Sequence, residues 1–449
     1  MLAGGLGILL VELDFLALNL SLPEMAEDLG TTTTDLQWAI SGYMLALAAF
    51  LVPGGRLGDI FGRKRTLLIG LVIFGLGALG AGLAPNPELV IFFRIVMGLG
   101  GAILFPLSVA IITDAFPPER TMRAIGNAYG IGAVAVAIGP IFGGALTQLI
   151  DWRAVLLVIF AIAVVCLLVV VAGVRESRDP SAPRSIDLPG LATVALGIAA
   201  ITFAIDRANE WSAAATIGLV VVGFLLLGAF VARERVAKWP LVDLALFRNR
   251  PYVIVTSIAT ACNIGFVVNV FLVTIYLQEV EGYTPIEAGA IFGAASLTAG
   301  IAGPLSGRLG ERFDVPRTMG LATLVGSVGL FIVSLRGDLG IFIVALAIVG
   351  IGYGTGWAMA SVGTQTVVPP EQAGVASGVT LSIVIGLAGI GVAAASMLLE
   401  SGSGSTSERI GEILMWLAIG IAIVGVGLAA WATWLDRHAG GGEPPPEPA

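Results

Sequence analysis

The chain has 449 residues, of which 57% are hydrophobic and only 12% are charged. Soluble proteins carry about twice that charged fraction, so the composition indicates a protein of the lipid bilayer. One histidine and two cysteines argue against a zinc or haem site, and no Gly-Lys pair exists to form a phosphate-binding loop. We therefore expect no metal, no cofactor, no nucleic-acid partner and no enzymatic activity.

Apolar runs recur along the whole chain. Each is about 20 residues long, which is the length that crosses ~30 Å of hydrocarbon as an α-helix. The runs are continuous rather than alternating, which excludes a membrane-spanning β-barrel. We predict an all-α polytopic membrane protein with fourteen spans, at 2–22, 36–56, 66–84, 89–113, 124–148, 153–174, 188–206, 213–232, 251–277, 285–306, 318–335, 339–365, 373–399 and 411–434.

A short, densely charged hinge at residues 55–66 follows the second span. A near-copy of it occupies residues 307–318, which is 252 residues later, and the same offset relates Gly98 to Gly350. Because the same spacing of 252 residues relates separate stretches of sequence without a gap, the chain is predicted to be a tandem duplication. Both copies run in the same direction along the chain.

The duplication divides the chain into four parts. We predict one six-helix bundle at 1–174 and a second at 251–436. The two spans within 175–250 have no counterpart in either copy, so they are an insertion. The last residues, 437–449, are rich in glycine and proline and are expected to be disordered.

Lysine and arginine gather in alternate loops. If the 55–66 hinge is cytoplasmic, 18 of the 23 basic residues lie in cytoplasmic loops and 4 in the opposite loops, with Arg94 inside a span. Because cytoplasmic loops carry the excess of basic residues, both termini are expected in the cytoplasm, with the protein in the plasma membrane. The first span carries acids and lacks a basic leader and a cleavage site, so we expect a retained helix.

Two parallel six-helix repeats with a charged hinge in each, and two inserted helices, resemble the major facilitator superfamily. More narrowly, the chain resembles the fourteen-helix drug:proton antiporter branch. The first hinge is similar to the family pattern G-x-L-x-D-x-x-G-R-K at Gly55, Leu57, Asp59, Gly62, Arg63 and Lys64. It departs from the pattern at Ile60, where a basic residue is usual.

Two further stretches carry the resemblance. The fifth span ends with Gly139, Pro140, Gly143 and Gly144, a pattern associated with antiporters. The first span carries Leu13-Asp14, followed by Asn19 and Leu22-Pro23, similar to the helix-one motif of the branch. The fourth span has Met97 where the family usually has glutamine. The resemblance implies a proton-coupled exporter of small lipophilic compounds that works by alternating access.

Three ionisable residues lie well inside spans, namely Glu12, Asp14 and Arg94. Each costs about 2.5–3.5 kcal/mol at the centre of a bilayer, so each should face a cavity and have a partner. Asp14 and Arg94 lie at similar depths, whereas Glu12 lies about 200° around the helix from Asp14. We favour Asp14 as the proton-coupling acid, with Glu12 as the alternative. Another possibility is that one acid only neutralises Arg94.

The hinge residues are expected to act mechanically. Asp59 is placed to accept hydrogen bonds from a helix N-terminus, which in the resembled fold begins near Pro370 and Glu371. Arg63 is placed to pair with Asp114. The alternative for the basic residues is that they only set the topology.

The second half has no buried acid. Substrate-cavity candidates are Asn19 from the first half and Asn263, Asn269, Tyr353, Trp357 and Gln365 from the second, with packing as the alternative for the aromatic residues. A cavity with so few acids favours neutral and monocationic substrates. A dedicated exporter of one metabolite or antibiotic, and a non-transporting receptor or scaffold, remain as alternatives. We expect the chain to act as a monomer.

Overall fold

The computed structural model describes residues 1–178, 187–369, 373–401 and 404–439, and these ranges are nearly all helical, with no strand. Fourteen helices are long and apolar enough to cross a membrane, which confirms the predicted fold class and number of spans. The helices are α1 (Leu2–Asn19), α2 (Leu22–Leu29), η1 (Asp35–Gln37), α3 (Trp38–Phe61), α4 (Arg63–Gly82), α5 (Pro87–Ala115), α6 (Pro118–Leu149), α7 (Trp152–Gly173), α8 (Leu188–Asp206), η2 (Arg207–Asn209), α9 (Ala213–Glu234), η3 (Leu244–Arg248), α10 (Arg250–Ile275), η4 (Tyr276–Val280), α11 (Pro285–Arg312), α12 (Val315–Ser334), α13 (Leu339–Val367), α14 (Ala373–Ser401) and α15 (Thr406–Ala439).

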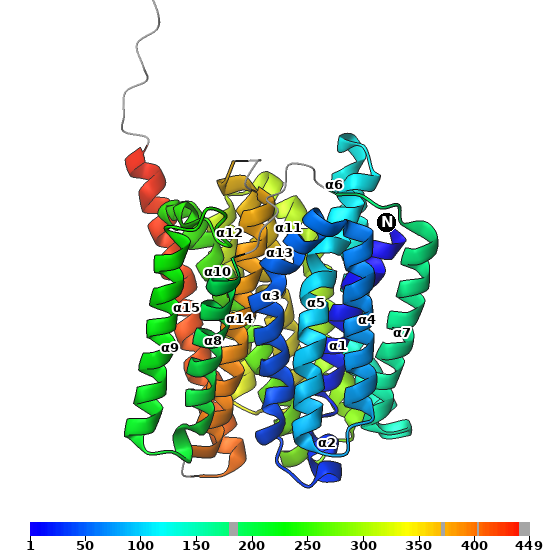
Figure 1. Ribbon diagram of the computed structural model, residues 1–449. Helices are drawn as coiled ribbons and strands as arrows, with labels where there is room; N and C mark the ends of the chain where they lie inside the picture. The colour runs from blue at the N-terminus through cyan, green and yellow to red at the C-terminus, as the bar shows by residue number, and fades with distance from the viewer. Residues whose placement is uncertain (179–186, 370–372, 402–403, 440–449) are drawn as a thin grey trace, which may run out of the picture.

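The two six-helix halves have the same internal packing. In the first half α3 packs on α5, α4 packs on α5 and α7, and α1 packs on α6. In the second half α11 packs on α13, α12 packs on α13 and α15, and α10 packs on α14. Each helix thus has the same neighbours as its counterpart, as a parallel tandem repeat requires. The inserted α8 and α9 pair with each other at one side of the bundle (Figure 1).

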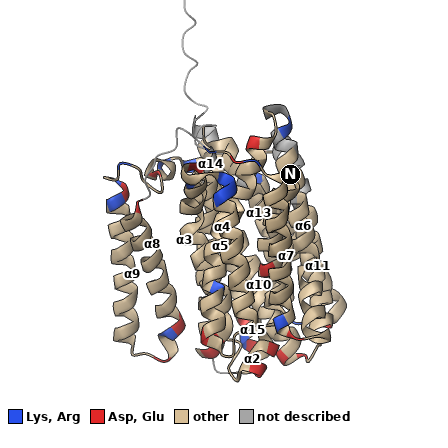
Figure 2. Cartoon of the chain, turned by 45° about the vertical axis from the view of Figure 1, so that its right-hand side comes forward, with Lys and Arg blue, Asp and Glu red and all other residues tan. Residues whose placement is uncertain are grey.

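Charged residues gather at the two ends of the bundle and are sparse between them (Figure 2). One end holds the turn between α3 and α4 together with the N-terminus, and we call it the hinge end. The opposite end holds the short helix α2, and we call it the α2 end (Figure 1). This distribution is what a bilayer selects, because charges avoid hydrocarbon.

The α2 helix is a departure from the predicted first span at 2–22. The transmembrane helix α1 ends at Asn19, and α2 follows after a two-residue break. Pro23 occupies the first turn of α2, where its missing N–H does no harm, and Gly30 ends the helix with φ of 65°. Hydrogen bonds to the Asp28 carboxylate, from Arg153 at 2.7 Å and the Trp152 indole at 3.1 Å, dock α2 on α7 and lower the pKa of Asp28.

The halves meet through two helix pairs, α6 on α11 and α3 on α14. These pairs are equivalent under the repeat, because α6 corresponds to α14 and α11 to α3. The helices α1 and α10 lie between them and are well enclosed, with 72% and 89% of their apolar windows buried, and α3 matches α1 at 72%. Side chains on these two helices are therefore placed to face the space between the halves.

Candidate functional site

Asp14 and Arg94 form an ion pair inside the first half. Asp14 lies on α1 and Arg94 on α5, both side chains are at most 1% exposed, and Nη1 of Arg94 lies 2.6 Å from Oδ2 of Asp14. The other carboxylate oxygen, Oδ1, is buried without a hydrogen-bond partner among the described residues. The pair neutralises two charges that are costly in hydrocarbon and leaves one oxygen able to take up a proton.

Three more groups hold the Arg94 guanidinium. Its Nε donates to the Ala39 carbonyl oxygen at 2.8 Å, and its central carbon lies 4.3 Å from the centroid of the Tyr43 ring. Its Nη1 also donates to the Met97 sulfur at 3.5 Å, so methionine keeps a contact at the position where glutamine is usual. The sequence analysis missed Ala39 and Tyr43. Their only signal is a spacing of four residues, which puts both on one face of α3.

Glu12 stands apart from this pair. Its side chain is half-buried, whereas Asp14 is fully buried, and Asp14 is the acid that contacts Arg94. The two acids thus have different surroundings although they are two residues apart on α1. The assignment of proton coupling to Asp14, with Glu12 as the alternative, stays a prediction.

Asn19, the last residue of α1, is buried and donates from Nδ2 to the Phe15 carbonyl oxygen at 2.6 Å. Ser21, just after α1, shares a hydrogen bond of 2.7 Å with Thr147 of α6. The end of α1 is therefore fixed to its own backbone and to α6. A substrate contact at Asn19 stays a prediction.

Two glycines of the α6 motif hold α6 against α1. A Cβ atom added to Gly143 would collide with the backbone of Ala17, and one added to Gly139 would press on the Leu16 side chain. Small residues let helix backbones approach closely in membranes. Because Asp14 lies one turn before Ala17 on α1, this packing also sets the position of the acid.

Gly144 of the same motif contacts the other half of the molecule. A Cβ atom on Gly144 would collide with the backbone of Pro285 at the start of α11. In return, a Cβ atom on Gly289 of α11 would meet the carbonyl of Pro140. The motif therefore lies at the contact between the halves as well as beside α1.

Arg63 joins the hinge to the end of α5. It forms ion pairs with Asp59 one turn earlier, at 2.9 Å, and with Asp114 of α5. All three side chains are partly exposed, so the cluster lies at the aqueous edge of the hinge end. The pairing of Arg63 with Asp114 matches the expected geometry, and the mechanical role of the cluster stays a prediction.

Two glycines shape the hinge. Gly62 has φ of 107°, which side chains rarely permit, and makes the turn from α3 into α4. Gly54 lies against the backbone of Ala102, where a Cβ atom would collide. Gly55, which the family pattern marks, has only ordinary contacts. Close approach of α3 to α5 therefore involves Gly54, before the pattern begins, and also Gly58 within it, where a Cβ atom would collide with the Leu107 side chain.

The segment after α7 closes over the hinge. The Glu176 carboxylate accepts hydrogen bonds from the backbone N–H groups of Lys64, at 3.0 Å, and Arg65, at 3.1 Å. This caps α4, since an acid is favoured at a helix N-terminus. The side chain of Lys64 donates to the Val171 carbonyl oxygen at 2.8 Å. Nothing in the sequence marks Glu176; the predicted contact of this kind joins Asp59 to the helix near Pro370 and Glu371, which lie outside the described residues.

The asparagines of α10 differ in their surroundings. Asn263 donates from Nδ2 to the Val384 carbonyl oxygen of α14 at 3.2 Å. Asn269 is fully buried, and neither its Oδ1 nor its Nδ2 has a hydrogen-bond partner among the described residues. A buried amide without partners is costly. Asn269 is therefore the second-half candidate whose surroundings most favour a substrate contact.

The three candidates on α13 are spread along the helix. Tyr353 is fully buried and shares a hydrogen bond of 3.1 Å with Ser327 of α12, which favours the packing alternative. Trp357 is half-buried and packs against the core. Gln365 is exposed near the hinge end of α13. Of these, Trp357 has the placement most compatible with a cavity wall.

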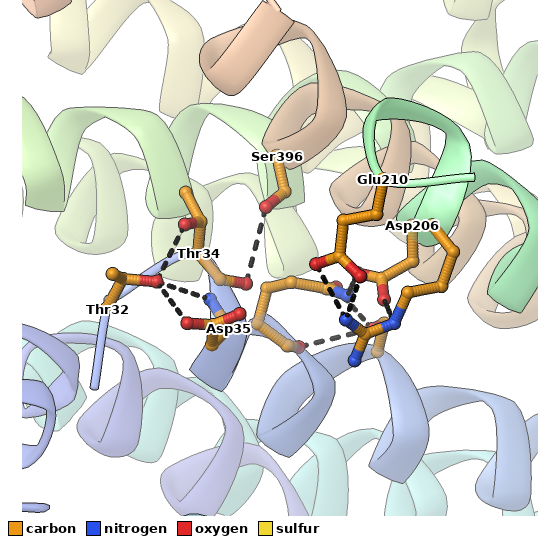
Figure 3. Close-up of polar contacts among 9 residues, drawn as sticks. Thr32, Thr34, Asp35, Asp206, Glu210 and Ser396 are labelled. Carbon is orange, nitrogen blue, oxygen red and sulfur yellow. Dashed lines mark hydrogen bonds and ion pairs between the residues drawn. The ribbon is translucent and has the colours of Figure 1, made fainter. Parts of the chain in front are cut away.

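Hydrogen bonds join the two halves at the α2 end. Figure 3 shows one of them, in which Ser396 of α14 meets the Thr34 carbonyl, near Asp206 at the end of α8 and Glu210 of the α8–α9 connection. The contacts are Thr33 to Glu279, Gln278 to the Leu20 carbonyl (2.9 Å), the Ile286 N–H to Gln148 (3.1 Å) and Ser396 to the Thr34 carbonyl (3.4 Å). The halves are therefore closed together at this end.

The residues that mark the repeat, the hinge and the buried ion pair all fall within a single family match. The family model described as Major Facilitator Superfamily matches residues 4–394. The chain belongs to the Major Facilitator Superfamily. It is thus a multi-pass membrane transporter, and the family predicted from the sequence is confirmed.

Relatives of this superfamily member include named export and resistance proteins. The Tetracenomycin C resistance and export protein of Streptomyces glaucescens is 30% identical over 420 residues, which cover 92% of this chain and 76% of that protein. Multidrug resistance protein Stp of Mycobacterium tuberculosis is 31% identical over 448 residues, which cover 98% of this chain and 77% of that protein.

Solved structures of other transporters share the fold of this superfamily member. A peptide transporter POT in complex with sulfate superposes with a TM-score of 0.70 and 16% identity, over 97% of this chain and 94% of that one. A bacterial homologue of the human lysosomal transporter Spinster, inward-facing and occupied, gives a TM-score of 0.66 and 18% identity, over 97% and 96% of the two chains. At these identities the likeness speaks for the fold alone.

Proposed function

We propose that this transporter is a proton-coupled antiporter that exports small lipophilic compounds, drugs among them, by alternating access between its halves. The observation that carries the proposal is the buried Asp14–Arg94 pair, with one carboxylate oxygen on the enclosed helix α1 that has no partner among the described residues. An intramembrane acid in such a place is costly, and transporters use such acids as proton relays. The names of the relatives support export of drugs or antibiotics.

The proposed cycle uses the pair as a switch. With the halves open toward the outside, Asp14 takes up a proton on Oδ1, and its attraction to Arg94 weakens. With the halves open toward the cytoplasm, the proton leaves as substrate arrives, and Arg94 again holds the carboxylate. Tyr43 and the Ala39 carbonyl keep the guanidinium in place when the acid is neutral. Proton and substrate then move in opposite directions.

The hinge is proposed to keep the hinge-end helices of the first half together as one unit while the halves move. Asp59, Arg63 and Asp114 connect α3, α4 and α5, and Glu176 fixes the start of α4. The four contacts at the α2 end would hold the two halves together at that end. Both sets of contacts are present in this structure, because the hinge contacts lie within the first half alone.

We propose that the hinge end faces the cytoplasm, in the plasma membrane, with both termini inside. The basis is the distribution of basic residues between alternate loops. The α2 end would then face outside. In this orientation the described hydrogen bonds between the halves close the outer side.

Substrates are proposed to be neutral or monocationic. The site holds two acids and one arginine in the first half, while Asn269 and Trp357 supply polar and aromatic surface from the second. A dedicated exporter of one antibiotic is the second candidate, favoured by the export protein among the relatives. The broad exporter and the dedicated exporter differ in the range of compounds they carry rather than in mechanism.

The test is transport into inverted membrane vesicles that contain the full chain. An imposed pH gradient, acid inside, should drive uptake of a lipophilic monocation such as ethidium, and collapse of the gradient should stop it. A panel of dyes and antibiotics separates a broad exporter from a dedicated one. Uptake that does not depend on the pH gradient would exclude proton coupling. Uptake of rigid dications at a rate equal to that of monocations would contradict the charge preference.

A further inference from the structure

A large apolar cavity lies between part of the inserted hairpin and the two halves, while elsewhere α8 packs directly on α3 and α14. Its volume is about 1020 Å³, and it lies in the hinge-end half of the bundle, between α8 and α9 on one side and α3 and α14 on the other. The linker from α9 to α10 covers its hinge end. Residues that line it include Ala49, Val52, Val194, Phe230, Leu241 and Ile383.

The hairpin is fixed to the bundle at both ends and spans the cavity between them. At the α2 end Asn209 donates to the Met397 carbonyl oxygen at 2.9 Å, and Gln37 donates to Asp206 at 2.8 Å. At the hinge end the attachment is made through the linker that follows α9, where Arg56 of α3 donates to the Pro240 carbonyl oxygen at 2.6 Å. Between these points α9 buries only Gly223 and Glu234, so it adds little packing to close the space. The cavity therefore results from the way the hairpin is attached, at its two ends and with little packing by α9 between them.

An apolar space in the membrane-spanning part of the bundle is expected to hold an apolar group. The space is only half enclosed, so hydrocarbon chains can enter it from the side, and leaving it empty would forfeit dispersion contacts of its apolar lining. Water has few polar partners in this lining, because apolar side chains dominate it. The occupant therefore carries a hydrocarbon portion.

Two arginines at the rim of the cavity indicate that its occupant carries negative charge. Arg235 follows α9 and Arg248 ends η3, both line the cavity, both are exposed, and neither forms an ion pair with a described residue. The nearby acids are engaged with the backbone, since Glu234 accepts from the Val242 N–H at 2.9 Å and Asp243 from the Ala245 N–H at 2.9 Å. Two unpaired guanidinium groups above an apolar chamber fit an anionic headgroup above acyl chains.

We propose that this cavity binds an anionic phospholipid from the hinge-end leaflet, with its acyl chains between the hairpin and α14 and its phosphate at Arg235 and Arg248. A neutral or cationic lipophile, the class proposed for transport, gains nothing from two unpaired arginines. The lipid fills the space that the hairpin leaves and joins α8 and α9 to both halves. The site is independent of the Asp14–Arg94 pair, which lies in the interior of the first half.

Lipid binding is measured on the purified full chain in detergent, by native mass spectrometry, with phosphatidylglycerol and phosphatidylcholine of identical chains. The wild type should bind one phosphatidylglycerol in preference to phosphatidylcholine. The double variant R235A/R248A should weaken phosphatidylglycerol binding about 20- to 30-fold, at roughly fivefold for each arginine, and leave phosphatidylcholine binding nearly unchanged. The matched control R175A/R178A removes two exposed arginines of the hinge end that do not line the cavity, and it should bind as the wild type does.

A second variant tests the apolar part. Ala49→Phe with Val194→Phe fills the cavity from α3 and α8, and it should lower binding of both lipids while R235A/R248A lowers only the anionic one. Equal binding of the two lipids by the wild type, or an equal loss in the R175A/R178A control, would overturn the proposal. Displacement of the bound lipid by tetraphenylphosphonium would also overturn it, because the cavity would then take the transported class of compound.

Discussion

At the scale of single residues, the Asp14 carboxylate is asymmetric. Oδ2 is held by Arg94 at 2.6 Å, whereas Oδ1 is buried without a partner in the described part of the chain. A purely structural ion pair would gain from a second hydrogen bond on Oδ1, because buried polar atoms are usually satisfied. An oxygen without a hydrogen bond is free to accept a proton. Once it is protonated, the neutral acid attracts Arg94 less strongly than the carboxylate did.

The first prediction concerns Asp14→Asn, which resembles the protonated acid. We expect uptake driven by the pH gradient in inverted vesicles to fall at least tenfold, because the side chain no longer exchanges a proton. Substrate exchange across the membrane without a gradient should persist. Glu12→Gln should have a smaller effect on gradient-driven uptake. Undiminished pH dependence in Asp14→Asn would transfer the coupling role to Glu12.

Loss of stability needs a separate control, because Asp14→Asn leaves Arg94 buried without its counter-charge. Breaking such a pair costs about 3–5 kcal/mol, whereas replacing both partners is often nearly neutral. The double variant Asp14→Asn/Arg94→Gln should therefore recover thermal stability in detergent relative to Asp14→Asn, but it should not recover coupling. Recovery of coupling together with stability would show that the pair is only structural.

At the scale of helices, the sequence predicts well what depends on local composition. Apolar runs locate the spans, and the constant offset identifies the repeat, because both follow from the bilayer and from duplication. The break between α1 and α2 was missed, since Leu22-Pro23 continues the apolar run of the first span. Glu176 was missed for another reason. Its partners are backbone N–H groups more than 100 residues earlier, at Lys64 and Arg65, and no periodicity marks such a contact.

The same limit applies to the candidate site. The sequence placed Asp14 and Arg94 at matching depths, because depth follows from counting residues along two helices. It did not identify Tyr43 or the Ala39 carbonyl, which reach Arg94 only because α3 packs on α5. For Tyr353, whose hydroxyl contacts Ser327, the choice between substrate and packing depended on which helix it faces. Side-chain direction at tertiary contacts is what a single sequence does not reveal.

The second prediction concerns the contact between α6 and α11. Gly144→Val places branched carbon atoms against the Pro285 backbone, where even a Cβ atom collides, so α6 and α11 should separate at the α2 end. We expect gradient-driven transport to fall at least tenfold. Gly130→Val is the matched control, since it lies on the same helix with no atom within 4 Å of a built Cβ, and it should transport normally. Equal losses in the two variants would attribute the effect to α6 itself rather than to its contact.

At the scale of the whole molecule, the third prediction is its orientation. A single cysteine at Glu210, in the exposed α8–α9 connection at the α2 end, should react with an impermeant maleimide added to intact cells. One at Arg178, exposed at the hinge end, should react only after the membrane is opened. Background should be low, because native Cys166 and Cys262 are both buried. The reverse pattern would place the hinge end outside.

The last prediction joins the closed α2 end to transport. Alternating access requires the halves to separate at this end, so contacts such as Thr33 to Glu279 have to break in every cycle. Cysteines at these two positions, joined by a short bifunctional maleimide, would hold α11 and its preceding segment against the first half. Transport should then stop, while substrate binding from the hinge end continues. The matched control joins Asp28 to Arg153, which contact each other at the same end within one half, and it should leave transport unchanged because no movement between halves is blocked. Transport that continues at full rate through the Thr33–Glu279 bridge would mean that the α2 end does not open by separation of the halves.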